Sequence, residues 1–398
     1  MSRSPELYQW RAEIARHFPR LSQPMVMGLA LWSLGMILVR SCSLTAMADW
    51  WSCRLGQPFQ TVRERLRDTY READAKAGAH RRQLELEACW APWLHWVLDG
   101  WSGTQLAVAL DATTLGQRWV VLVISVVYRG CAVPIGWKVL PAGIKHPWRP
   151  EWLALLKRLR GRVSPTWTVI VLADRGLYAK WLFEGIQDLG WHPLLRVNLG
   201  GSFRPAGWYH WVPFRQLVPA VGHRWQGAGT AFTHPKTRLR CTLLGRWEAG
   251  HEAPWLILTD VPPPAADACW YGLRAWIEQG FKRIKRGGWQ WQSTRMTDPA
   301  RVERLWLAIA IATWWVLAVG GEAEAAIPAA TFPTVPGSPR QQDRRWRLVG
   351  IFRHGWSSIV AALFNHQSLP LGHGRPEPWP AVPISPDSLL LPALEGET

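Results

Sequence analysis

The sequence predicts an α/β fold: a mixed β-sheet covered by helices, preceded by helical segments and interrupted by a β-rich insertion. Two observations carry this prediction. Long apolar stretches with strand character fill residues 105–150, and strand and helix patterns then alternate up to residue 198. This order is typical of a mixed sheet packed against helices. The chain of 398 residues is long enough for more than one domain and a sizeable core.

Residues 1–100 have a helical pattern. Apolar side chains recur at helical spacing through Met25–Val39, and Ser43 is placed to cap a short helix that ends near Trp51. A turn over Arg54–Pro58 and a basic helix follow. This order is similar to a helix-turn-helix, so the region is a candidate DNA-binding domain. A plain helical bundle with solvated charges fits the same pattern.

The main domain is expected over residues 101–320. Its predicted elements, in order, are a strand ending in an acid (105–113), two long strands joined at Tyr128–Gly130 (118–141), an amphipathic helix (151–163), an apolar strand ending in an acid (166–176), a helix closed by Gly190, and a strand (191–198). Residues of about 200–265 are rich in Gly, Pro and Trp with short alternating stretches, which predicts the β-rich insertion. From Ala266 the pattern is helical through Val319, with an interruption at Gly287–Gly288.

The C-terminal part, residues 321–398, is expected to lie outside the main domain. Residues 321–342 are rich in Ala and Pro, which is typical of a linker. Residues 343–366 are expected to form a basic amphipathic helix. The Pro-rich tail from Ser368 is expected to be disordered.

Charge and composition bound the partners. Lys and Arg number 46 against 29 Asp and Glu, so the formal net charge is +17. Such an excess predicts a polyanionic partner, first nucleic acid and second an anionic membrane surface, although a merely basic proteome gives the same balance. Two apolar runs, Met25–Val39 and Leu305–Val319, are shorter than a membrane span and are predicted to be buried helices without membrane contact.

The cysteines and the N-terminus bear on location. Six cysteines show neither a CxxC pair nor the Cys/His spacing of a zinc site, and are expected to be reduced thiols. The charged N-terminus lacks the apolar core of a signal peptide. We therefore expect a cytoplasmic, nucleoid-associated protein.

Two apolar strands each lead into an aspartate, Asp111 and Asp174. Strands of one sheet can bring such carboxylates together, and two close carboxylates need a cation or a shared proton. Hard oxygen ligands facing a phosphate suit Mg²⁺ or Mn²⁺. For either aspartate alone, a turn former or a helix cap is the more common explanation, and only the presence of both shifts the balance toward a cation site.

The predicted helix at 271–285 carries Tyr271, Arg274, Glu278 and Lys285. Offsets of three, four and seven residues lie on one face of an α-helix, so these side chains would form a single polar face. A carboxylate flanked by cations suits a metal held beside a phosphate. An ordinary surface pair between Arg274 and Glu278, four residues apart, fits the same spacing.

At these residues the chain resembles the DDE transposases of bacterial insertion sequences that carry a Y-x2-R-x3-E-x6-K signature and a β-insertion before the glutamate. Tyr271, Arg274, Glu278 and Lys285 match the signature in type and spacing. The segments DAT at Asp111 and ADRG at 173–176 are similar to those around the family's first two acids, and PWLILTDVP is similar to its W-L-x-L-T segment. The resemblance covers roughly residues 100–320.

The resemblance implies an RNase H-like catalytic core preceded by a domain that binds the element's ends. Asp111, Asp174 and Glu278 would be catalytic and would bind two Mg²⁺ or Mn²⁺ ions. The partners would be double-stranded DNA, as inverted-repeat ends and target, and a second copy of the chain in the DNA complex.

The resemblance also implies the DNA contacts. Tyr271, Arg274 and Lys285 would contact phosphates, and Trp255 would stack on a flipped base, although a strand-end core position explains this tryptophan as well. Neighbouring cations would add phosphate contacts; they are Lys282, Arg283, Arg286, Arg295, Arg301 and Arg304. Arg175 follows the second acid, but the sequence assigns it no role.

The expected activity is therefore cut-and-paste transposition, in which water first frees a 3′-OH and that 3′-OH attacks target DNA. Two alternatives stay open on sequence: a DNA-binding regulator or domesticated relic without catalysis, and an RNase H-like nuclease that cuts without joining. The presence of all three acids favours an enzyme over a relic.

Overall fold

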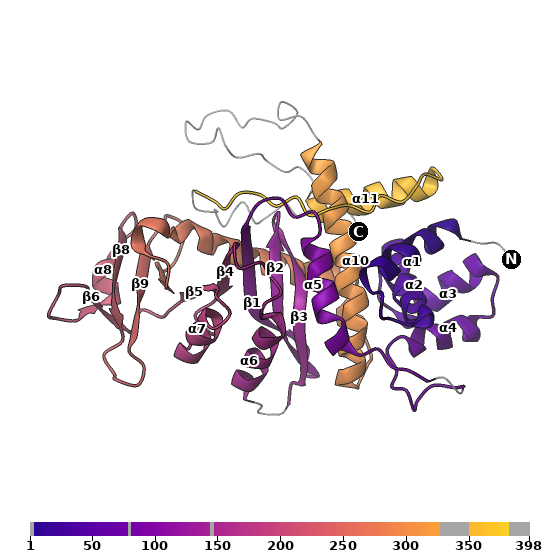
Figure 1. Cartoon of the computed structure of the whole chain (residues 1–398), viewed down its shortest axis with the longest axis horizontal. Coiled ribbons are helices and arrows are strands. Elements are labelled where there is room, and N and C mark those ends of the chain that lie inside the picture. Colours follow the sequence, from indigo (N-terminus) through magenta and orange to yellow (C-terminus); the bar gives the residue numbers. More distant parts are fainter. Residues whose placement is uncertain (1–3, 79–80, 144–146, 327–349, 382–398) are drawn as a thin grey trace.

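The computed structural model describes residues 4–78, 81–143, 147–326 and 350–381. All ten strands in these ranges form one sheet, in the order β3-β2-β1-β4-β5-β10-β9-β8-β6-β7 (Figure 1). The strands are β1 Gln105–Leu115, β2 Trp119–Tyr128, β3 Cys131–Pro141, β4 Thr168–Ala173, β5 His192–Arg196, β6 Ser202–Pro205, β7 Val212–Pro213, β8 Arg224–Ala231, β9 Leu239–Arg246 and β10 Trp255–Thr259. The predicted mixed sheet is thus present.

The strands of the first half pair in two ways. β1, β2 and β3 are antiparallel neighbours, and a turn at Arg129 and Gly130 with positive φ joins β2 to β3. β4 pairs parallel with β1 and with β5. Parallel neighbours need a crossover, which the helices α6 (Trp148–Leu159) and α7 (Lys180–Gln187) supply. These elements confirm the strand and helix order predicted for residues 105–198.

Helices cover both faces of this half (Figure 1). On β3, Gly136 faces Leu155 of α6, while the next residue, Trp137, donates its indole N–H to the Glu303 carbonyl of α10 (Pro299–Ala325). Successive strand residues point to opposite faces, so α6 and α10 lie on opposite sides of the sheet. The core between them is apolar and rich in fully buried tryptophans.

The N-terminal residues form α1 Pro5–His17, α2 Gln23–Val39, α3 Leu44–Leu55, α4 Phe59–Asp68, η1 Leu86–Ala88 and α5 Trp90–Leu98. Ser43 caps α3 as predicted, and its hydroxyl accepts from the Ala46 N–H. The basic helix α4 is shorter than the predicted one, because the chain turns at Tyr70 so that Glu72 can pair with α10. Trp10 of α1 stacks on Trp315 of α10 with ring centroids 3.6 Å apart.

The predicted β-rich insertion is present as strands, but it is not a separate sheet. β10 pairs with β5 through Ile257 and Leu258, and β9, β8, β6 and β7 continue outward from it. The remaining elements of this part are α8 Phe214–Leu217, η2 Pro263–Ala265, η3 Ala268–Ala275, α9 Trp276–Lys282, η4 Arg283–Gly287 and η5 Trp291–Ser293. The insertion therefore extends the central sheet to one end of the molecule (Figure 1).

Two helical segments pass a length-and-hydropathy test for a membrane span. α10 has 27 residues, longer than the apolar run predicted at Leu305–Val319, and 94% of its most apolar window is buried inside the protein. α2 and α3 pass the test only as a pair bent by 96°. The prediction of a buried helix is confirmed for both apolar runs.

The C-terminal part corrects one prediction. Residues 368–381 are not disordered in the structure: the Gln9 side chain binds both backbone groups of Leu369, and Trp315 donates to the Pro370 carbonyl. Buried indole N–H groups need acceptors, and a Pro-rich segment supplies carbonyls without competing donors. α11 spans Ile351–Phe364. The predicted linker is wrong at its start, because residues 321–325 are the last turn of α10. Residues 327–342 of that linker and residues 382–398 of the predicted disordered tail lie outside the described residues.

Candidate active site

Strands β1 and β4 bring two aspartates side by side. Their parallel pairing ends at Leu110 and Ala173, and the next residue in each segment is an acid: Asp111 within β1 and Asp174 directly after β4. Asp111 does not end its strand as predicted: β1 continues to Leu115, because its other edge stays paired with β2 while β4 stops. The two carboxylates therefore stand one residue beyond the last shared register of the parallel pair.

The segment that carries the third acid is not one uniform α-helix. It begins as the 3₁₀ helix η3, becomes α-helical in α9, and ends as the π-helix η4. The prediction that Tyr271, Arg274, Glu278 and Lys285 share one face of a single α-helix is therefore wrong. In a 3₁₀ helix, residues three apart eclipse each other, so Tyr271 and Arg274 leave η3 on one side. Glu278 follows one turn later in α9, and Lys285 lies in the π-helical turn.

Arg274 lies between the three acids. Its Nη2 is 2.8 Å from Asp111 Oδ2 and 3.5 Å from Asp174 Oδ2, and its Nη1 is 2.6 Å from Glu278 Oε1. The acids come from two strands and one helix, up to 167 residues apart in the sequence. The structure thus brings Asp111, Asp174 and Glu278 to one guanidinium.

The charges of this cluster do not balance. One guanidinium faces three carboxylates, so two formal negative charges remain when all are ionised. Burial raises the pKa of Asp111, and the nearby carboxylates of Asp174 and Glu278 raise it further. Arg274 and the Ala112 N–H lower it, but they do not fully offset the effect of burial. An excess of negative charge in a half-buried site favours a further cation.

The two aspartates differ in how they are held. Asp174 Oδ1 accepts from the backbone N–H groups of Gly176 and Leu177, which leaves Oδ2 toward Arg274. A Cβ at Gly176 would lie 3.3 Å from that Oδ1, so the turn fits glycine closely. Asp111 Oδ1 accepts only from the Ala112 N–H next to it among the described residues. Glu278 is the most exposed of the three acids, with 54% of its side chain exposed.

The donor set fits a hard divalent ion. Carboxylate oxygens are the preferred ligands of Mg²⁺ and Mn²⁺, and the net negative charge matches a divalent cation. In the described ranges, however, no three His, Cys, Asp or Glu side chains stand at metal-ligand spacing, because Arg274 occupies the space between the acids. A metal would have to compete with this guanidinium for the same oxygens.

Tyr271 and Trp255 are buried together. Their ring centroids are 5.4 Å apart and nearly perpendicular, and only 4% and 7% of their surfaces are exposed. Burial raises the pKa of Tyr271 to about 12. Both rings are therefore packed inside the protein. Tyr271 does not face solvent as a phosphate contact would, and Trp255 does not face solvent as a base-stacking platform would.

The predicted cations fall into two groups. Lys282, Arg286 and Arg295 are exposed, and Lys285 is half-buried, where burial first and Arg286 second lower its pKa. The others have partners inside the protein: Arg283 lies over the Phe352 ring, and Arg301 and Arg304 bind Glu72. Arg175 is exposed.

Sequence reasoning missed two features of the site. It treated Arg274 as a phosphate ligand and missed its place between all three acids, although the Arg–Glu spacing of four residues was a partial signal. It also missed that the C-terminal segment reaches η3: Trp379 packs on Trp270, with ring centroids 4.8 Å apart. No local pattern signals a contact between residues so distant in the sequence.

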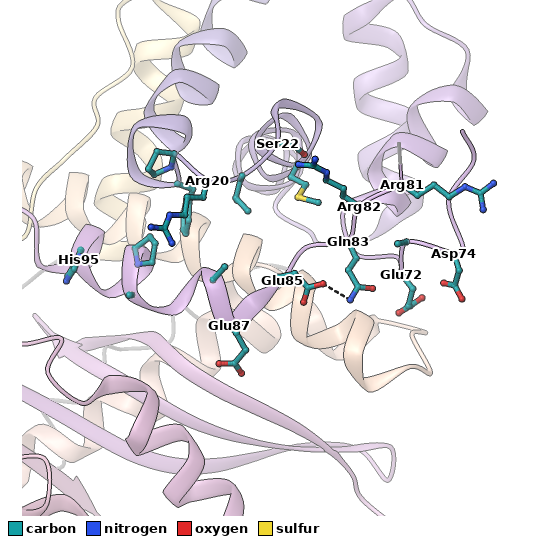
Figure 2. Close-up of a pocket in the computed structure, with 18 of the residues that line it drawn as sticks. Arg20, Ser22, Glu72, Asp74, Arg81, Arg82, Gln83, Glu85, Glu87 and His95 are labelled. Carbon is teal, nitrogen blue, oxygen red and sulfur yellow. Dashed lines mark hydrogen bonds between the residues drawn. The ribbon is translucent and has the colours of Figure 1, made fainter. Parts of the chain in front are cut away.

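A cavity of about 1100 Å³ lies elsewhere, between the α1–α2 connection, the segment 72–88 and α5 (Figure 2). Its charged lining residues have both signs; they are Arg20, Glu72, Asp74, Arg81, Arg82, Glu85, Glu87, His95 and Arg162. None of the predicted site residues lines it. The mixed charges suit neither a polyanion nor a metal.

Comparison with known families decides the relationship. The model of the transposase DDE domain matches residues 107–315, just over half of the chain, from within β1 to within α10, and this range contains the three acids. This chain belongs to the DDE transposase family. Among solved structures, the transposase is similar to the piggyBac transposase in its synaptic complex with hairpin DNA, with 12% identity and a TM-score of 0.42 over 91% of this chain and 79% of that one. No curated protein matches the transposase.

Proposed function

We propose that this transposase cuts DNA at the ends of its own insertion sequence and joins the freed 3′-OH to target DNA. One observation carries the proposal: carboxylates from β1, β4 and α9 reach the same guanidinium within 3.5 Å. A surface ion pair between Arg274 and Glu278 alone would not need the two aspartates of the sheet. The family supports transposition in general, and this geometry supports the assignment of its three acids.

In the proposed mechanism, Asp111, Asp174 and Glu278 would hold two Mg²⁺ or Mn²⁺ ions. When bound, such ions would supply activation of the attacking oxygen and stabilisation of the leaving one. The two aspartates are fixed by the sheet and by backbone N–H groups, while the exposed Glu278 can adjust. Arg274 keeps the acids together before they are loaded, and its guanidinium suits a phosphate oxygen afterwards.

We also propose an RNase H-like core around these acids. The order β3-β2-β1-β4-β5, with β1–β3 antiparallel and β1, β4 and β5 parallel, supports it. The helices of residues 1–100 would bind the element's ends. Two such ends have to be paired, so the DNA complex would contain at least two copies of the chain, in the cytoplasm at the nucleoid.

A donor plasmid tests this proposal. With Mg²⁺ and a plasmid that carries the element's ends, we expect the full-length protein to release the element and to insert it into a target. Asp111→Asn, Asp174→Asn and Glu278→Gln should each lower cleavage by about a thousandfold or more, since each removes a ligand for the ions. Glu184→Gln is the matched control, because Glu184 on α7 is as exposed as Glu278 and should not affect cleavage.

The alternatives give different products. A regulator or relic would bind the ends without cutting them, and a nuclease would cut without inserting the element. Cleavage that persists after the loss of any of the three acids contradicts the assignment of that residue.

A further inference from the structure

The insertion has an unusual charge distribution. Between Asp188 and Glu248 lie 59 residues without a single Asp or Glu, and they contain eight Lys or Arg. These eight account for almost half of the net charge of +17 in about a seventh of the chain. A stretch with only positive charges repels itself unless an anion binds to it.

Three of these arginines gather on one face. Arg204 of β6 pairs with Thr230 of β8, which pairs with Arg240 of β9, so the three residues lie in one row across the sheet. Directly opposed residues of a sheet point to the same face. Arg238 lies just before β9, two residues ahead of Arg240, and shares the Trp211 ring with Arg204. None of the three arginines forms an ion pair with any residue that the structure describes.

An aromatic ring orders two of them. The Arg204 and Arg238 guanidinium carbons lie 5.2 and 5.7 Å from the ring centroid of Trp211, and Arg238 also donates to the Thr233 carbonyl. Two cations drawn to one ring form a fixed positive surface without a counter-charge. The arrangement is therefore built before any ligand arrives.

The hairpin between β6 and β7 projects beside this surface. Gly207 turns the chain with a φ of 80°, and the next two residues, Trp208 and Tyr209, are 49% and 98% exposed. Tyr209 contributes almost no burial within the described protein, and about half of Trp208 is open to solvent. Aromatic side chains next to arginines are typical of nucleic-acid surfaces.

We propose that this insertion face, formed by Arg204, Trp208, Tyr209, Trp211, Arg238 and Arg240, binds the backbone of duplex DNA outside the cleavage site. The proposal rests on the proposed function in that DNA is the substrate. The arginines neutralise phosphates, and the β6–β7 hairpin enters a groove, since the major groove accommodates a two-stranded β-ribbon.

The position of the face makes this a second contact. β8 is four strands from β4 in the sheet, about 19 Å at the usual strand spacing. The insertion and the N-terminal helices lie at opposite ends of the molecule, with β1 and β4 between them (Figure 1). DNA held at the insertion face is therefore a different stretch from the one at the acids.

The test measures binding of full-length protein, without a divalent metal, to a duplex that lacks the element's ends. The affinity is measured over a range of salt concentrations for the wild type and for Arg204→Ala/Arg238→Ala/Arg240→Ala. Each lost phosphate contact lowers the slope of log affinity against log salt by about 0.9, so we expect a reduction of two to three in the slope. The charge-matched control is Lys157→Ala/Arg160→Ala/Arg162→Ala, which removes three exposed cations from another part of the surface and should leave the slope unchanged.

A second variant guards against misfolding. Tyr209→Ala changes an almost fully exposed side chain, and we expect about a tenfold loss of affinity with an unchanged salt slope. Equal slopes for the wild type and the triple variant would overturn the proposal, as would unchanged affinity in Tyr209→Ala. The proposal would also be overturned if the triple variant bound duplex DNA as the wild type does but no longer bound polyglutamate or anionic vesicles, because the face would then serve a different polyanion. Because no cleavage is measured, failure here is separate from failure of the proposed chemistry.

Discussion

Two ion clusters in this protein have opposite compositions. At the candidate active site, one guanidinium, Arg274, faces three carboxylates. Where the N-terminal region meets α10, one carboxylate, Glu72, faces two guanidinium groups, with 2.7 Å from Oε2 to Arg301 Nη2 and from Oε1 to Arg304 Nη1. The first cluster has an excess of negative charge and the second an excess of positive charge.

The pKa values respond in opposite directions. The hydrogen bond from Arg301 lowers the pKa of Glu72 to about 2, so its charged form is well stabilised. Burial raises the pKa of Asp111 despite Arg274. The Glu72 cluster stabilises its own ionised carboxylate, so it needs no further ion and can serve a purely structural role. A cluster that destabilises an acid in the absence of a further cation is typical of a site that binds one.

The larger effect on stability is expected at Glu72. Glu72→Gln should lower the free energy of unfolding at pH 7 by about 2 kcal/mol, because two partly buried arginines lose their carboxylate. Since the folded-state pKa is lowered, this stability is fully present above the ordinary value of 4.5 and is lost as the pH falls toward 2. Denaturant unfolding of wild type and variant across pH 2–7 should therefore show the difference vanish at the acidic end.

Its control is Glu87→Gln, which removes an ion pair with Arg158 whose acid is 67% exposed. We expect a loss below about 0.5 kcal/mol for this pair. A similar loss in both variants would show that Glu72 is an ordinary surface acid.

A smaller effect of opposite sign is expected at Asp111. Asp111→Asn should raise the free energy of unfolding of the metal-free protein at pH 7 by about 1 kcal/mol, because burial and the two neighbouring carboxylates disfavour the ionised aspartate. Because the folded-state pKa is raised, ionised Asp111 costs stability as the pH rises through that pKa, and the gain should disappear below the ordinary value of 3.8. Asp188→Asn, at an exposed acid, should leave stability unchanged, and destabilisation by Asp111→Asn would contradict the comparison.

The regular elements near the site could be predicted from the sequence. Apolar runs bounded by turn residues predicted β2, β3, β4 and α6, because each of these buries a continuous apolar face. The signature spacing singled out Arg274 and Glu278, since three- and four-residue offsets are local.

The remaining features depend on contacts between distant residues. The sequence predicts Arg301 and Arg304 as DNA ligands, but Glu72, more than 200 residues away in the chain, binds both. The changes from 3₁₀ to α to π geometry after Ala268 occur where this segment packs against the sheet, and no local propensity predicts them. The ordered segment 368–381 is held by contacts with distant residues: its Pro370 carbonyl, for example, accepts the indole N–H of Trp315.

The most direct test of the central claim is to measure the binding of Mn²⁺ to the protein without DNA. Binding is monitored by electron paramagnetic resonance and by thermal unfolding. The wild type should bind two ions and unfold at a higher temperature when they are present, because the ions neutralise the charge that Arg274 leaves uncompensated. Asp111→Asn/Asp174→Asn should lose both the bound signal and the thermal shift. The same binding and the same shift in this double variant would contradict the account.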